Sequence, residues 1–102
     1  DKSWVDLLIA CWPGGSITGA PKLRSCQRLF EIEKYSRGPY CGSFIKVDWN
    51  GEFDSNILIR SFIVKNKQIN ISAGCGIVSD SDPQNETEEL KWKLLPLIDS
   101  LK

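Results

Sequence analysis

The chain has 102 residues, of which 13 are basic and 13 acidic, so its formal net charge is zero, and its pI is near 6.4. Proteins that bind nucleic acid or anionic lipid usually carry excess positive charge, so neither partner is expected here. Apolar residues make up 41% and charged residues 25% of the chain, which excludes a wholly disordered chain, a collagen or a coiled coil.

Histidine and methionine are both absent from the sequence. Without histidine, neither a Ser-His-Asp nor a Cys-His catalytic group can form within the chain, and no zinc site with imidazole ligands can form either. Natural reading frames normally begin with methionine. Because this chain begins at Asp1, we expect it to be part of a larger protein.

The four cysteines are widely spaced and form no C-x-x-C pair. Their apolar neighbours, and the lack of a visible signal peptide, favour free buried thiols in a cytoplasmic protein over the two disulfides of a secreted one. The longest apolar run, residues 5–12, is broken by Asp6 and is far shorter than the roughly 20 residues that span a bilayer, so no membrane-spanning segment is expected. The cysteines are Cys11, Cys26, Cys41 and Cys75.

The first predicted elements are two helices. Apolar residues recur at helical spacing from Ser3 to about Trp12, with Ser3 as the N-cap. A second helix is predicted from Pro21 to about Tyr35, because Pro is favoured in the first turn and the apolar residues again recur every three or four positions. Proline and glycine follow both segments and end the helices.

The pattern then changes to alternation, which predicts a meander of three antiparallel strands. The expected strands are Tyr40–Asp48, Glu52–Lys65 and Gln68–Ala73. Asn50-Gly51 is a strong signal for a two-residue hairpin, and Asn66-Lys67 indicates a second tight turn. Apolar residues occur on both faces of these strands, which implies that a layer covering the second face is missing.

A last helix is predicted to follow Asp82, its N-cap, and to be kinked or made irregular by Pro96. The order helix, helix, three-stranded antiparallel meander, helix defines an α+β fold. No repeat or linker divides the chain.

Three groups of residues have the chemistry needed to bind an ion or a small ligand. The first is the glycine-rich segment 14–22, which leads directly into a helix. Amides at a helix N-terminus favour an anion, and Lys22 adds a positive charge. The spacing differs from that of a P-loop, and an ordinary loop between helices is the alternative.

The second group lies on the last helix. Glu86 and Glu89 are three residues apart, so their carboxylates project from one helix face and can hold a hard cation such as magnesium. Lys93 shares this face and is placed to contact an anionic ligand. The alternative is a solvated charged face, with the glutamates stabilised by the helix dipole.

The third group is Arg60, expected in the apolar strand 57–60, together with Tyr40 on the first strand. Guanidinium and hydroxyl groups of this kind bind a carboxylate, whereas the alternative is an edge-strand arginine that faces water. Glycines flank Cys75 in the segment 74–76, which indicates a turn where the backbone approaches a ligand closely. Together these residues predict a site for a dianionic small molecule and a divalent cation.

Five segments occur in the order found in the C-terminal part of the chorismate-utilising enzymes. They are GGSITGAPK (14–22), RGPYCGS (37–43), ILIRS (57–61), AGCGIVSDSDP (73–83) and the pattern E-x-x-E-x-x-x-K (86–93). The chain therefore resembles this family over nearly its whole length. GSITG (15–19) and PYCGS (39–43) are more similar to the para-aminobenzoate branch, aminodeoxychorismate synthase component I, than to the anthranilate branch.

The resemblance implies a magnesium-dependent enzyme that replaces the hydroxyl of chorismate with ammonia from a glutamine amidotransferase. Its product would be 4-amino-4-deoxychorismate, used for para-aminobenzoate and folate synthesis. Residues 1–102 would be the C-terminal segment of a single chorismate-binding domain, built from two antiparallel sheets packed face to face. The alternatives are a fragment of anthranilate synthase component I, used for tryptophan synthesis, and a non-catalytic remnant that binds an anion or a partner.

The resemblance also assigns roles to single residues. Glu86 and Glu89 match magnesium ligands. The substrate-binding matches are Lys93 near the ring carboxylate, Tyr40 and Arg60 at the enolpyruvyl carboxylate, Gly74, Cys75 and Gly76 in the loop that cradles the substrate, and Lys22 of the GAPK motif.

The same resemblance limits what the chain alone can do. The family's upstream acidic pair, its histidine-containing segment and its nucleophilic lysine have no counterpart here, so no catalytic residue is assigned and the isolated chain is predicted to be inactive. Leu90 and Cys75 depart from the usual family residues, as does the segment 44–46.

The apolar sheet face that no helix covers further predicts a homodimer.

Overall fold

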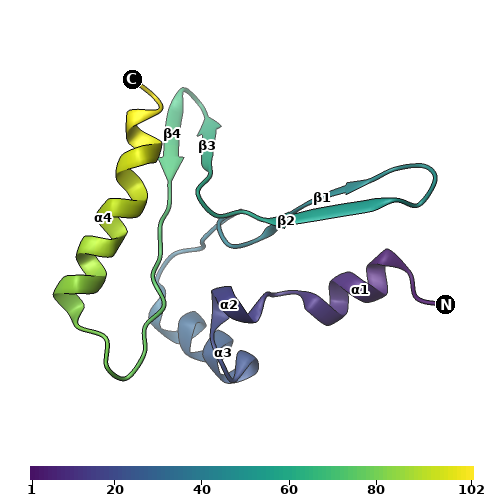
Figure 1. Ribbon diagram of the computed structural model, residues 1–102, viewed down its shortest axis with the longest axis horizontal. Helices are drawn as coiled ribbons and strands as arrows, with labels where there is room; N and C mark the ends of the chain where they lie inside the picture. The colour runs from purple at the N-terminus through teal and green to yellow at the C-terminus, as the bar shows by residue number, and fades with distance from the viewer. The chain divides into compact units, whose positions relative to one another are not determined.

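The computed structural model describes all residues from 1 to 102 and divides into two compact units, residues 1–57 and 58–102. The first unit contains three helices and two strands, and the second contains two strands and one helix (Figure 1). The predicted α+β class is therefore confirmed. The prediction that residues 1–102 form the C-terminal segment of one domain stays a prediction.

Helix α1 (Trp4–Cys11) begins where its cap predicts. The Ser3 hydroxyl accepts a hydrogen bond from the Asp6 amide at 3.3 Å, and the Asp6 carboxylate accepts one from the Ser3 amide at 2.8 Å. This reciprocal capping box satisfies amides that a helix start leaves unpaired. The hydrogen bond from the Ser3 backbone is the main reason why the pKa of Asp6 is lowered.

The second predicted helix is present as α3 (Lys22–Ile32), with Pro21 at its N-cap. The glycine-rich segment before it contains a short helix that the sequence did not predict, α2 (Gly15–Thr18). Gly19 separates the two helices with φ of 96°, a left-handed conformation that favours glycine. A Cβ at this position would also lie only 3.0 Å from the Ser25 hydroxyl.

Strands β1 (Ser43–Val47) and β2 (Phe53–Ile57) form an antiparallel pair in which Val47 is opposite Phe53. The Asp48 amide donates to the Glu52 carbonyl at 2.9 Å, and the Gly51 amide donates to the Asp48 carbonyl at 2.9 Å. Three residues therefore form the loop, with Gly51 at φ of 89°. The predicted hairpin is confirmed. The predicted two-residue turn was wrong, because Glu52 is hydrogen-bonded to Asp48 and not to Trp49.

The long second strand of the predicted meander is divided in two. It is interrupted over residues 58–61, where Arg60 has φ of 50°, a left-handed conformation that no extended strand contains. Strand β3 (Phe62–Lys65) then pairs only with β4 (Gln68–Ile71). The molecule thus has two two-stranded sheets, and the single three-stranded meander was wrong.

The turn between β3 and β4 is the predicted Asn66-Lys67. Asn66 has φ of 52° and Lys67 has φ of 61°. Two consecutive positive φ values are those of a type I′ turn, whose twist matches that of the strands it joins. This tight turn is confirmed.

Helix α4 (Pro83–Asp99) also begins at its predicted cap. The Asp82 carboxylate accepts hydrogen bonds from the Gln84 and Asn85 amides, each at 3.0 Å. Pro83 occupies the first helical position, where its missing N–H costs nothing. The helix continues through Pro96 to its end.

No side chain in either unit is buried. Phe30 remains 88% exposed, and Trp49 is fully exposed. The four thiols are free, as predicted, but the expected burial was wrong, because Cys11 is exposed and the other three are half-buried. The apolar residues that the sequence marks as core have no covering layer, and this is why the thiols stay accessible. No helix has the length and apolar character needed to cross a membrane.

Candidate functional site

The first half of α4 and the loop before it bring five of the predicted site residues together. The Asp82 cap fixes where the helix starts and so places Glu86 in its first turn. Glu89 and Lys93 follow at intervals of three and four residues, which puts all three side chains on one face of the helix.

Glu86 is held by the loop that precedes the helix. The Ser81 hydroxyl donates to Oε1 of Glu86 at 2.7 Å. The second oxygen, Oε2, is shielded from solvent and has no hydrogen-bond partner. The hydrogen bond from Ser81, followed by that from the Cys75 thiol, lowers the pKa of Glu86, so the carboxylate is ionised at neutral pH.

Cys75 lies against the same carboxylate. Its hydrogen bond to Glu86 is the main cause of a raised pKa, and burial and the negative charges of Glu86 and Glu89 raise it further, while Lys93 opposes them. Three charged side chains of α4 therefore act on one thiol of the preceding loop. The raised pKa keeps Cys75 in the neutral thiol form, which is a poor nucleophile.

Lys93 connects the helix to the glycine-containing loop. Its Nζ atom donates to the Gly74 carbonyl at 2.9 Å and forms an ion pair with Oε1 of Glu89. Gly76 is next to this loop segment, and nothing lies within 4 Å of the position that a Cβ there would occupy. The loop backbone and the charged helix face therefore form one local arrangement.

The remaining predicted residues lie elsewhere. Arg60 belongs to the same unit but is exposed and lies in the bend between β2 and β3, so its placement in a strand was wrong. Lys22 and Tyr40 belong to the first unit. Lys22 is the exposed first residue of α3, and Tyr40 is half-buried in the turn before β1 instead of in that strand.

Two carboxylates on this helix face, those of Glu86 and Glu89, are candidate ligands for a magnesium ion. No group of three or more acidic, cysteine or histidine side chains is gathered in a way that could hold a metal, but magnesium is commonly bound by only one or two protein carboxylates, with water and substrate oxygens completing its shell. The unpartnered Oε2 of Glu86 suits the role of the first carboxylate ligand. Glu89 has one oxygen paired with Lys93, which leaves the other for a cation.

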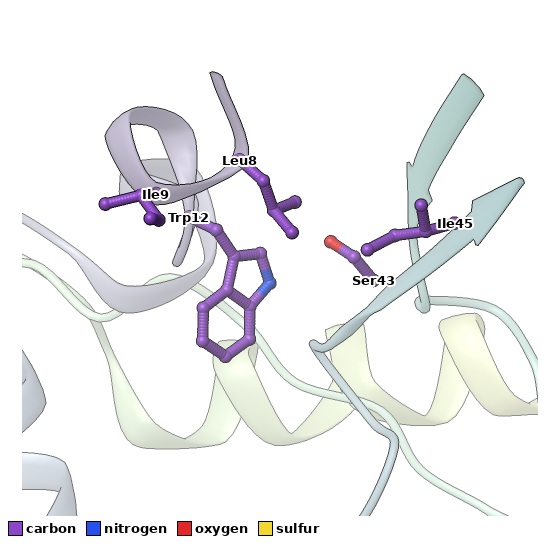
Figure 2. A pocket seen from close by; sticks show the side chains of 5 residues that line it. All are labelled: Leu8, Ile9, Trp12, Ser43 and Ile45. Carbon is purple, nitrogen blue, oxygen red and sulfur yellow. The ribbon is translucent and has the colours of Figure 1, made fainter. Parts of the chain in front are cut away.

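An apolar groove that the sequence did not predict lies in the first unit. It has a volume of about 480 Å³, and Figure 2 shows Leu8 and Trp12 projecting toward strand β1. Its location between a helix and a strand follows from tertiary packing, so no local sequence signal could have revealed it. The lining residues are Leu8, Ile9, Trp12, Ser43 and Ile45.

On this helix face and the loop beside it lie two carboxylates, one ammonium group and one thiol. The chain belongs to the family of chorismate binding enzymes, which matches residues 1–99.

Individual relatives carry two different names. The chain is 48% identical over 93 residues to the chloroplastic aminodeoxychorismate synthase of Arabidopsis thaliana, covering 91% of this chain and 10% of that protein. It is 47% identical over 89 residues to anthranilate synthase component 1 of Bacillus pumilus, covering 87% and 17%. With the same component of a Synechocystis strain, identity is 38% over 107 aligned positions, covering 100% and 21%. The chain thus spans about a fifth or less of these relatives.

Proposed function

We propose that residues 1–102 are the C-terminal segment of the chorismate-binding domain of an aminodeoxychorismate synthase component I. In this proposal the complete polypeptide converts chorismate and ammonia to 4-amino-4-deoxychorismate. The ammonia comes from a glutamine amidotransferase, and magnesium is the cofactor. The observation that supports the proposal most is the gathering of Gly74, Cys75, Glu86, Glu89 and Lys93 around one helix face.

The chain's own residues would bind and orient the substrate. Bound magnesium would neutralise the charge of a substrate carboxylate and of the departing hydroxyl. Glu86 and Glu89 would hold the cation, and Lys93 would attract the carboxylate of the ring while keeping the Gly74 carbonyl in place. Precise orientation of this kind lowers a barrier by removing the entropy cost of bringing reacting groups together.

Arg60, Lys22 and Tyr40 complete the proposed substrate contacts. Arg60 is exposed, and the structure shows no ion pair to its guanidinium, which leaves it available for a substrate carboxylate. A planar guanidinium binds such a group through two parallel hydrogen bonds. Its role would be to position the enolpyruvyl group, not to transfer a proton.

Anthranilate synthase component I is the second candidate. Identity does not separate the two, since relatives of both names reach 47–48%. The segment GSITG, residues 15–19, supports the para-aminobenzoate branch by its similarity. A cytoplasmic location would suit either synthase.

Product analysis tests the proposal. The full-length polypeptide that carries this chain is incubated with chorismate, ammonium ions and magnesium. The products are then separated and identified by mass spectrometry. We expect 4-amino-4-deoxychorismate, and none without magnesium. Anthranilate as the product would support the second candidate, and no chorismate consumption would indicate the non-catalytic remnant.

A further inference from the structure

The loop before α4 contains a hydroxyl whose two hydrogen bonds fix the orientation of Glu86. The Ser81 Oγ atom accepts a hydrogen bond from the Val78 amide at 3.1 Å. The Ser81 amide in turn donates to the Val78 carbonyl at 3.1 Å. Ser81 is thereby anchored twice to a residue three positions earlier, before its side chain reaches the helix.

This anchoring decides where the hydroxyl proton points. A serine hydroxyl has a single proton to donate, and the Val78 amide already occupies an acceptor position on Oγ. The proton is directed to Oε1 of Glu86 at 2.7 Å, within the range of a strong O–H···O⁻ hydrogen bond. One oxygen of the carboxylate is therefore occupied.

The other oxygen is left for a ligand. Oε2 of Glu86 is shielded from solvent and accepts no hydrogen bond, although the Cys75 thiol lies near the same carboxylate, and an unpaired carboxylate oxygen in such a place is costly unless something binds it. The hydrogen bond to Oε1 limits rotation of the carboxylate, so Oε2 stays directed away from Ser81.

We propose that Ser81 is a positioning residue that presents Oε2 of Glu86 to the cation. This rests on the proposed function, in which Glu86 is a magnesium ligand. Partners of this kind orient a metal ligand without touching the metal, and their loss typically weakens metal affinity or activity about 10-fold to 100-fold.

The test uses the full-length polypeptide and magnesium chloride alone, titrated into the metal-free protein by calorimetry. Ser81→Ala is expected to weaken magnesium binding at least about 10-fold, whereas Ser81→Thr keeps the hydroxyl and is expected to restore it. Ser79→Ala is the matched control, because the Ser79 hydroxyl lies in the same loop and contacts only Asp80, at 3.2 Å. Its magnesium affinity should equal that of the unaltered protein.

Two further results separate the inference from the function on which it rests. If Glu86→Gln abolishes magnesium binding while Ser81→Ala leaves it unchanged, the positioning role is wrong and the proposed function stands. If Glu86→Gln binds magnesium as the unaltered protein does, the metal site itself is wrong. Equal losses in Ser81→Ala and Ser79→Ala would also overturn the inference, because they would reveal a general effect on the loop.

Activity measurements supply a second readout. Ser81→Ala should raise the magnesium concentration required for half-maximal chorismate turnover, with kcat recovering at saturating magnesium. A loss of kcat that saturating magnesium does not recover would contradict a role in presenting the ligand.

Discussion

At the scale of single residues, Lys93 connects two parts of the candidate site. Its ammonium group binds both the Gly74 carbonyl and the Glu89 carboxylate, so it joins the loop to the helix. An anionic ligand that approached this lysine would compete with Glu89 for it. Binding of a cation to Glu89 would release the lysine toward such a ligand, which gives a physical reason for a cation and an anion to bind together.

Replacement of this lysine provides a direct test. Lys93→Gln in the full-length polypeptide is expected to weaken chorismate binding about 10-fold to 100-fold, because hydrogen bonds to charged groups contribute about 1.5–3 kcal/mol. Lys91→Gln, two residues away on the same helix, serves as the control. The measurement is the KM for chorismate at fixed magnesium, and an equal KM for both variants would contradict the assignment.

Part of the candidate site could be predicted from the sequence. The spacing of Glu86, Glu89 and Lys93 was enough to place them on one helix face. The contacts of Cys75 and Ser81 were not predictable, since both depend on how an irregular loop folds back onto the helix. Ser81 stands just before the Asp82 cap, and that position is the only signal in the sequence that could have drawn attention to it.

At the scale of secondary structure, the starts of helices were predicted well where a capping residue marks them. Ser3 and Asp82 mark the starts of α1 and α4 because their side chains bind amides that a helix leaves unpaired. The interruption of the long strand was missed, because arginine has no special preference for the left-handed conformation that Arg60 adopts. Asn66 does tolerate that conformation, and its turn was predicted correctly.

The α4 cap also supports the site and can be tested on its own. Asp82→Ala should destabilise the helix start by about 1 kcal/mol, since the Gln84 and Asn85 amides lose their acceptor. Hydrogen exchange measured by NMR should show faster exchange of these two amides. Asp80→Ala is the control, and equal protection in both variants would show that the cap does not hold the helix.

At the scale of the whole molecule, the chain lacks a buried core. No residue is buried in either unit, although strongly apolar side chains are present in both. The sequence predicted this in part, because both faces of its strands are apolar. It could not show which segment of polypeptide covers them.

The isolated chain should therefore associate with itself. We expect the 102-residue chain to sediment as a dimer or a larger species and to unfold without a cooperative thermal transition, because exposed apolar surface of this extent favours association. Sedimentation velocity and calorimetric melting measure these two properties. A monomer with a sharp transition would contradict the expectation and would indicate a chain that is stable by itself. We further expect this chain to show no chorismate turnover.

In the proposed function, Glu86 links magnesium to chorismate in the complete protein. Chorismate binding to the full-length polypeptide, titrated calorimetrically with and without magnesium, tests it most directly. Glu88→Gln is the matched control, because Glu88 is an exposed glutamate of α4 outside the site. We expect magnesium to strengthen chorismate binding at least about 10-fold in the unaltered protein and in Glu88→Gln, and to have no effect in Glu86→Gln. Magnesium-dependent binding that persists in Glu86→Gln would contradict it.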